Sequence, residues 1–266
     1  MQFPPVIVRE LREESHRPAT ARIRAGAVGI ALFTLTMLWA FGEIAEGEGD
    51  QTFSILNTLF CVCIWLIVPF MTADCISREK REGTLGLLFL TPLTSSQIIF
   101  GKTVCHALRA FGLLLAVMPL MLICFMLGGI GWQVALIALC MNSATLVLAL
   151  SAGFLASSYT ERWNRAIGST IVVTAVFLAL YALNIALAGE WFSPRKVRWD
   201  VGNLVERLFE MGFGAGREWT QTRRGFGFTQ IAAVCAQCFF FALGVSGASL
   251  WLARRQIGKA RCAEPV

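Results

Sequence analysis

The segment from Asp74 to Glu82 carries six charged residues in nine, and it lies between two long apolar stretches of the chain. Glu79 and Glu82 are three residues apart and therefore share one face of a helix, while Arg78 and Arg81 can pair with acidic groups across one turn. Carboxylate and guanidinium groups at this spacing form charge-assisted hydrogen bonds with complementary groups on another molecule. The chemistry that this segment predicts is the docking of a soluble partner.

Catalytic or metal chemistry has weaker support in the sequence. Cys235 and Cys238 have the spacing of a zinc or redox pair, but no second pair of cysteines or histidines completes such a site. The two histidines, His16 and His106, have no carboxylate or second histidine at ligand spacing. Most of the nine cysteines lie in apolar stretches, where free cysteine behaves as a small hydrophobic residue. We expect this chain to bind no metal and no cofactor, and we do not expect an intramembrane enzyme.

A short stretch resembles the end of a phosphate-binding loop. Gly101, Lys102 and Thr103 have the right order, but the motif requires a glycine five residues before Gly101, where this chain has Ser96. The motif also follows a strand, whereas this stretch lies in a predicted helix. The chain is therefore not expected to hydrolyse ATP by itself.

Membrane-spanning helices are the elements that must position these residues. The chain has 266 residues, of which 56% are hydrophobic and only 15% charged, whereas soluble proteins have about 25% charged residues. A crossing needs roughly 20 apolar residues. The sequence predicts an all-α polytopic membrane protein with six crossings, at residues 25–41, 53–73, 103–127, 132–156, 166–188 and 229–253.

Three other segments complete the predicted organisation. Residues 1–24 predict an amphipathic helix, either on the membrane surface or solvated, with Arg9 and Glu10 on one side and the stem of Arg12 on the other. Residues 189–228 predict a small folded cap on the outer surface, and residues 254–266 a basic tail. The six-helix domain then comprises residues 25–253, with its charged loop at 74–102.

The distribution of basic residues predicts the orientation. Sixteen of the 23 lysines and arginines lie on the side that holds both termini and the charged loop, and the other seven all lie in residues 189–228. Cytoplasmic loops carry the excess of basic residues, so both termini and the charged loop are predicted to be cytoplasmic. The net charge of +6 is explained in this way, and nucleic-acid binding is not expected.

The third crossing is predicted to be longer than the bilayer. Thr94 and Gln97 have the spacing of a capping box, and a helix that starts there and runs to residue 127 would be about 50 Å long. Lys102, His106 and Arg109 would form a basic stripe on this helix. We expect the stripe to extend to the lipid headgroups, with a binding role for His106 as the alternative.

The charged loop resembles a family motif. The sequence SREKREGTLGLLFLTPLTSSQIIFGK is similar to the loop of type-2 ABC transporter permeases. The matching positions are Arg78, Glu79, Arg81, Glu82, Gly83, Thr84, Leu85, Leu87, Leu88, Thr91, Pro92, Leu93, Gly101 and Lys102. Gly86 departs from the pattern, because relatives have a larger or acidic residue there. The segment with Arg9, Glu10 and Arg12 is similar to the interfacial helix of these permeases.

The resemblance implies a role for each part of the chain. Residues Arg78 to Thr84 would form a coupling helix that inserts into a groove on an ABC ATPase subunit, a separate chain that binds ATP and Mg. A second permease subunit, identical or different, would complete the transporter in the bacterial inner membrane. The expected activity is export driven by that ATPase.

Uncharged polar residues inside the crossings are the candidates for a translocation path. These are Asn142 and Thr145 in the fourth crossing and Gln237 in the sixth. Asn142 is predicted to form an interhelical hydrogen bond, with a contact to cargo as the alternative. The lack of intramembrane charge favours an amphipathic, lipid-like or drug-like cargo. A channel or secondary transporter not powered by ATP is the alternative function, although such proteins usually carry charges or ion ligands within their crossings.

Overall fold

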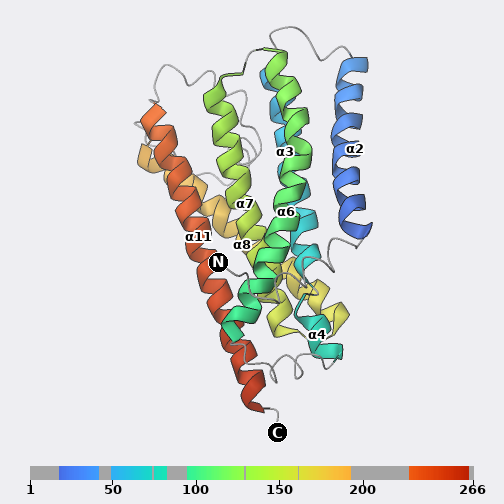
Figure 1. Ribbon diagram of the computed structural model, residues 1–266. Coiled ribbons are helices and arrows are strands. Elements are labelled where there is room, and N and C mark those ends of the chain that lie inside the picture. Colours follow the sequence, from blue (N-terminus) through green and yellow to red (C-terminus); the bar gives the residue numbers. More distant parts are fainter. Residues whose placement is uncertain are drawn as a thin grey trace, which may run out of the picture.

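The structure is a computed structural model, and it describes residues 18–41, 49–73, 75–82, 95–128, 130–160, 162–192 and 228–263. These residues form seven helices and no strands (Figure 1). Six of the helices are long and apolar enough to cross a membrane. The predicted all-α polytopic fold is therefore confirmed.

The helices follow the predicted crossings but extend beyond most of them. Their bounds are α2 Pro18–Ala40, α3 Gly49–Ala73, α4 Ser77–Glu82, α6 Ser95–Met126, α7 Trp132–Tyr159, α8 Trp163–Phe192 and α11 Phe228–Ala263. α2 starts at a proline, which is tolerated in the first helical turn because no N–H is needed there. The 32 residues of α6 give a length of about 48 Å, as the sequence predicted.

α7 is the central helix of the bundle. It packs against α11, α3 and α8, and most of its residues from Asn142 to Ser158 are buried. Many of these buried residues are alanine, serine or glycine, whose small side chains allow neighbouring helices to approach closely. α2, α8 and α11 lie further out and leave large apolar side chains exposed, as expected of helices in lipid.

The two ends of the bundle differ in charge. α4 lies at one end, and the connection between α6 and α7 lies at the other (Figure 1). Within each described helix, the lysines and arginines lie nearer the end on the α4 side of the bundle. Exposed aromatic residues occur in both halves, with Trp39 and Trp132 far from α4 and Tyr159 and Trp163 near it. This distribution is typical of the two interfaces of a membrane.

The prediction for the basic stripe of α6 is wrong for two of its three residues. Lys102 is 7% exposed and His106 is 9% exposed, so neither extends to the lipid headgroups. The imidazole of His106 packs edge-on against Phe154 of α7, with the ring centroids 5.5 Å apart. Packing against α7, which no pattern within α6 reveals, places this face of α6 in the protein interior.

Several predictions fall outside the described residues. They concern the N-terminal helix with Arg9, Glu10 and Arg12, the end of the charged loop at Gly83 and Thr84, and the proposed outer cap beyond residue 192.

Candidate functional site

The short helix α4 is held against the last turns of α7. We call this region the α4–α7 contact, and it comprises Ile76, Ser77 and Lys80 on one side and Gly153, Phe154, Ser157 and Ser158 on the other. α3 ends at Ala73, so the contact lies where the second crossing turns into the charged segment.

A single serine accepts hydrogen bonds from two backbone N–H groups at the start of α4. The hydroxyl oxygen of Ser157 accepts the backbone N–H of Ile76 at 2.8 Å and that of Ser77 at 3.0 Å. The first N–H groups of a helix have no partner within that helix, so an external acceptor stabilises them. All three residues are buried, which makes these hydrogen bonds costly to lose.

A lysine makes the next bond along α4. Lys80 Nζ donates to the backbone carbonyl oxygen of Ser158 at 2.6 Å. The last carbonyl groups of a helix carry partial negative charge, so a lysine there is favourable. The positive charge of Lys80 therefore joins α4 to the end of α7.

Apolar packing reinforces these bonds. Ile76 is 2% exposed and packs with Phe154, which is 1% exposed, while Cys75 and Leu250 complete the cluster. The ring of Phe154 also meets His106 edge-on. Side chains from α6 and α11 thus pack against the α4–α7 contact.

A glycine allows α3 and α7 to approach at the same level. A Cβ atom at Gly153 would lie 2.5 Å from the carbonyl oxygen of Pro69 and would also overlap the hydroxyl of Thr72. That hydroxyl donates to the Pro69 carbonyl at 3.0 Å, so the side chain is fixed. Only glycine fits at this position without moving one of the two helices.

Of the predicted docking residues, those from Arg78 to Glu82 lie within the part of the chain that the structure describes. Arg78 and Arg81 lie on α4 and are exposed, and Glu79 and Glu82 belong to the same helix. Gly101 and Lys102 lie well inside α6, where the backbone N–H groups take part in the helix. Among the described residues, no three His, Cys, Asp or Glu side chains come together as metal ligands would.

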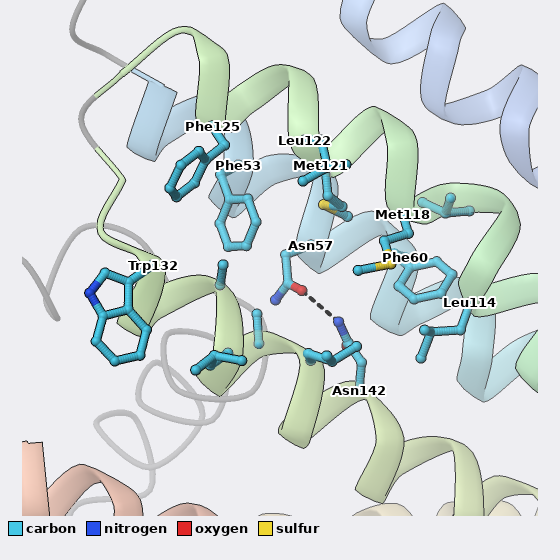
Figure 2. Close-up of a pocket in the computed structure, with 15 residues that line it drawn as sticks. Phe53, Asn57, Phe60, Leu114, Met118, Met121, Leu122, Phe125, Trp132 and Asn142 are labelled. Carbon is cyan, nitrogen blue, oxygen red and sulfur yellow. Dashed lines mark hydrogen bonds between the residues drawn. The ribbon is translucent and has the colours of Figure 1, made fainter.

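A cavity of about 360 Å³ lies in the other half of the bundle, between α3, α6 and α7. We call it the α3–α6–α7 cavity. Its lining includes Phe53 and Phe60 from α3, Met121 and Phe125 from α6, and Trp132 from α7 (Figure 2). The cavity is therefore apolar and rich in aromatic side chains.

An amide pair crosses this cavity. Asn142 Nδ2 of α7 donates to Asn57 Oδ1 of α3 at 2.8 Å, which confirms the predicted interhelical hydrogen bond of Asn142. The hydroxyl of Thr145 donates to the carbonyl oxygen of Asn142, one turn along α7, and Thr145 does not line the cavity. Gln237 belongs to α11 and does not line the cavity either.

Sequence reasoning missed the α7 residues of the α4–α7 contact and the Asn57 half of the amide pair. Ser157, Ser158 and Gly153 occur in a run of small residues that indicated only helix packing. Asn57 was an ordinary polar residue near the start of a crossing. The only available signal was the presence of polar and very small residues in otherwise apolar helices.

The fold and the two sites define a polytopic helical membrane protein with a short charged helix braced on its central helix. The sequence profile described as "ABC-2 family transporter protein" matches residues 35–194, which include α3 to α8. The chain is also 31% identical over 159 residues to the "Probable ABC transporter permease protein NosY" of Pseudomonas aeruginosa. That match covers 59% of this chain and 49% of the relative, so it spans about half the length of the relative.

The profile covers more than half of the chain, and the chain therefore belongs to the ABC-2 transporter family, the type-2 ABC permeases. The predicted family is thus confirmed. It is a multi-pass membrane protein with six candidate crossings.

Proposed function

We propose that this chain is the membrane-spanning subunit of an ATP-driven exporter and that α4 receives the movement of a separate ATPase subunit. The observation that carries the proposal is the α4–α7 contact. Ser157 and Ser158 join α4 to one end of α7, and Asn142 and Trp132 line the cavity toward its other end. The 28 residues of α7 span about 42 Å, so one helix connects the charged segment with the cavity.

A rigid connection of this kind can transmit a displacement. A packed helix moves as a unit when a partner pushes one end, and a small shift at that end repositions the side chains at the other. Because α7 packs against α3, α8 and α11, its displacement would change its packing with these helices. Export by alternating access to the cavity is the function that this arrangement supports best.

ATP hydrolysis is assigned to a partner chain. Gly101 and Lys102 lie in the interior of α6, and helical backbone cannot wrap around phosphate groups. The family membership of the chain supports an ATPase partner, which would hold ATP and Mg. We also expect a second permease subunit, because the α3–α6–α7 cavity occupies only the half of the described bundle away from α4.

The orientation belongs to the same proposal. Within each described helix the lysines and arginines lie nearer the end on the α4 side of the bundle, and under the positive-inside rule this supports a cytoplasmic location for α4 and both termini. The cavity then faces the outer half of the bacterial inner membrane.

Thiol labelling tests the orientation. A cysteine introduced at Glu48 is expected to react with a membrane-impermeant maleimide in intact cells, and one at Glu82 only after permeabilisation. The parent chain, labelled in parallel, corrects for the native cysteines. Labelling of the Glu82 position in intact cells would reverse the orientation.

Charge reversal on α4 tests the docking role. The permease is purified through an affinity tag from membranes that also contain its ATPase partner, and ATP hydrolysis by the preparation is measured. Glu82→Lys is expected to reduce hydrolysis per permease at least tenfold, because removing one partner of an interfacial charge pair costs about 2–5 kcal/mol. Glu46→Lys, the same change in the segment of the sequence between α2 and α3, serves as the matched control. Equal hydrolysis in Glu82→Lys and the parent would refute docking through α4.

A further inference from the structure

The α3–α6–α7 cavity has the size and lining of a small-molecule site. Its volume of about 360 Å³ falls in the usual range of about 300–1,000 Å³ for ligand pockets. Phe53, Phe60, Phe125 and Trp132 provide flat surfaces for ring systems. None of the described residues that line the cavity is ionisable at neutral pH. A charged ligand would thus find no counter-charge there.

Two polar groups in the cavity have no hydrogen-bond partner among the described residues. Asn57 is 4% exposed and Asn142 is 7% exposed, and a single hydrogen bond joins their side chains. That bond leaves the second half of each amide, Asn57 Nδ2 and Asn142 Oδ1, without a partner. Figure 2 shows the nitrogen of Asn57 turned away from Asn142.

The unsatisfied groups point to a ligand with a polar group of its own. Neither Asn57 Nδ2 nor Asn142 Oδ1 is fully enclosed, so both are accessible from the cavity, and an amide group left without a partner in apolar surroundings costs about 1–3 kcal/mol. The conclusion does not depend on which amide donates, because exchanging oxygen and nitrogen in both residues again leaves one donor and one acceptor. A ligand that supplies a carbonyl, hydroxyl or N–H group at this position would satisfy one or both.

The cavity is open to the side of the bundle. Met118 is 40% exposed, Leu122 is 55% exposed and Trp132 is 58% exposed, and all three line the cavity. Met118 and Leu122 lie inside the candidate span Phe100–Met126 and Trp132 lies at the end of its own, so the opening extends from the membrane interface into the apolar interior of the bilayer. A ligand that dissolves in the membrane can enter from there.

The depth of the amide pair separates two classes of membrane ligand. Asn142 lies ten residues after Trp132, which places it about 15 Å from the end of α7, near the middle of a bilayer about 30 Å thick. The charged head of a phospholipid stays at the surface, and its chain has no polar group to offer at that depth. A small uncharged molecule can place a polar group there.

We propose that the α3–α6–α7 cavity binds an uncharged, membrane-soluble aromatic molecule whose single hydrogen-bonding group is held by Asn57 and Asn142. This inference goes beyond the proposed function, because binding requires neither ATP nor a partner subunit. The site recognises its ligand by ring stacking against the aromatic lining and by one hydrogen bond to the amide pair.

The test uses three probes with related ring systems on the full chain in lipid nanodiscs, with empty nanodiscs as the background. N-phenyl-1-naphthylamine is uncharged and has one N–H, 1-benzylnaphthalene replaces that N–H by a methylene group, and 8-anilino-1-naphthalenesulfonate adds a charge. We expect saturable binding of the first, about tenfold weaker binding of the second, which is about 1.4 kcal/mol, and no saturable binding of the third.

Variants locate the site. Ala135→Phe fills the cavity and should abolish saturable binding, whereas Ala179→Phe, the same change on the exposed face of α8, should leave it unchanged. Asn57→Leu with Asn142→Leu replaces both amides by apolar groups, a change that can preserve folding. This double variant should bind N-phenyl-1-naphthylamine about tenfold more weakly and remove its advantage over 1-benzylnaphthalene. The melting temperature of each variant verifies folding.

Three results would overturn the inference. One is unchanged binding in folded Ala135→Phe, and another is equal saturable binding of the sulfonate. The third is a tightly held phospholipid, detected by native mass spectrometry, that N-phenyl-1-naphthylamine fails to displace. Unchanged ATP hydrolysis in Glu82→Lys together with normal probe binding would contradict the proposed function alone, so the two failures are distinguishable.

Discussion

Replacing Gly153 by valine is expected to lower the melting temperature of the permease by about 2–12 °C. A Cβ atom at this position would lie 2.5 Å from the carbonyl oxygen of Pro69 and would overlap the hydroxyl of Thr72. A backbone carbonyl cannot rotate aside, so α3 and α7 must separate. Overpacking in a well-packed interior costs about 1–3 kcal/mol, and each kcal/mol lowers the melting temperature by about 2–4 °C in a chain of this size class.

The expected loss of stability is larger than that for an ordinary glycine substitution, because the contact between α3 and α7 at Gly153 also supports the start of α4. Separation of α3 from α7 at Gly153 also moves Phe154 and Ser157, which hold the start of α4. The measurement is the melting temperature of the purified chain in detergent, together with the yield of monodisperse protein.

Gly168→Val on α8 is the matched control. A Cβ atom at Gly168 has nothing within 4 Å, and the residue is exposed, so this change retains the helix-propensity cost without the collision. Gly153→Ala combined with Thr72→Ala should recover part of the loss, since it removes the hydroxyl but leaves the carbonyl in place. Equal melting temperatures for the Gly153→Val and Gly168→Val variants would show that α3 and α7 do not approach as closely as described.

Hydropathy predicts the crossings because it responds to a local property, the length of an apolar run. All six predicted crossings correspond to helices. Helix ends were less predictable from hydropathy, since α11 continues to Ala263, past the predicted end of its crossing at residue 253. The start of α6 at Ser95 was predicted by the capping box at Thr94 and Gln97 and not by hydropathy. Polar residues can continue a helix into water, and hydropathy does not mark where they stop.

Contacts between helices were not predictable in the same way. The sequence indicated that Asn142 would bond to another helix, but the partner, Asn57, lies 85 residues away. The basic stripe of α6 was assigned to the headgroups because a stripe looks the same whether it faces lipid or protein. Only the position of Phe154 on α7 shows that His106 faces inward.

The cavity requires still more information. Its lining combines one face from each of α3, α6 and α7, so its existence depends on the rotation of three helices about their axes. Hydrophobic patterning fixes such rotations poorly when all faces of a helix are apolar, as they are in lipid. The polar lining at Asn57 and Asn142 is therefore a structural finding, and the docking role of α4 stays a prediction.

Replacing Ser157 by alanine is expected to release the start of α4 without unfolding the bundle. The change removes the acceptor of two buried N–H groups, those of Ile76 and Ser77. Loss of a partner for a buried group costs about 1–3 kcal/mol, and a local destabilisation of about 2 kcal/mol increases opening roughly 30-fold. Amide hydrogen exchange across residues 75–82 should therefore accelerate by about that factor in the assembled complex.

Two further variants define the cause. Ser169→Ala on α8 removes a hydroxyl that bonds only to the carbonyl of Ala166 in its own helix, so exchange in α4 should stay at the parent rate. Ser157→Thr keeps a hydroxyl acceptor and should retain most of the protection. Comparing the exchange rates of these variants separates the effect of losing the Ser157 hydroxyl from the general effect of replacing a serine in a membrane helix.

The same variant distinguishes docking from transmission. If α4 only anchors the ATPase, Ser157→Ala should leave both copurification of the ATPase and its rate of hydrolysis unchanged. If α4 transmits movement through α7, the ATPase should still copurify with Ser157→Ala, because Arg78 and Arg81 remain exposed on α4. The rate of ATP hydrolysis, however, should then respond less to the conformation of the permease. Parent-like exchange at Ile76 and Ser77 would mean that Lys80 and the packing of Ile76 hold α4 by themselves. The route from α4 to α7 would then not depend on Ser157.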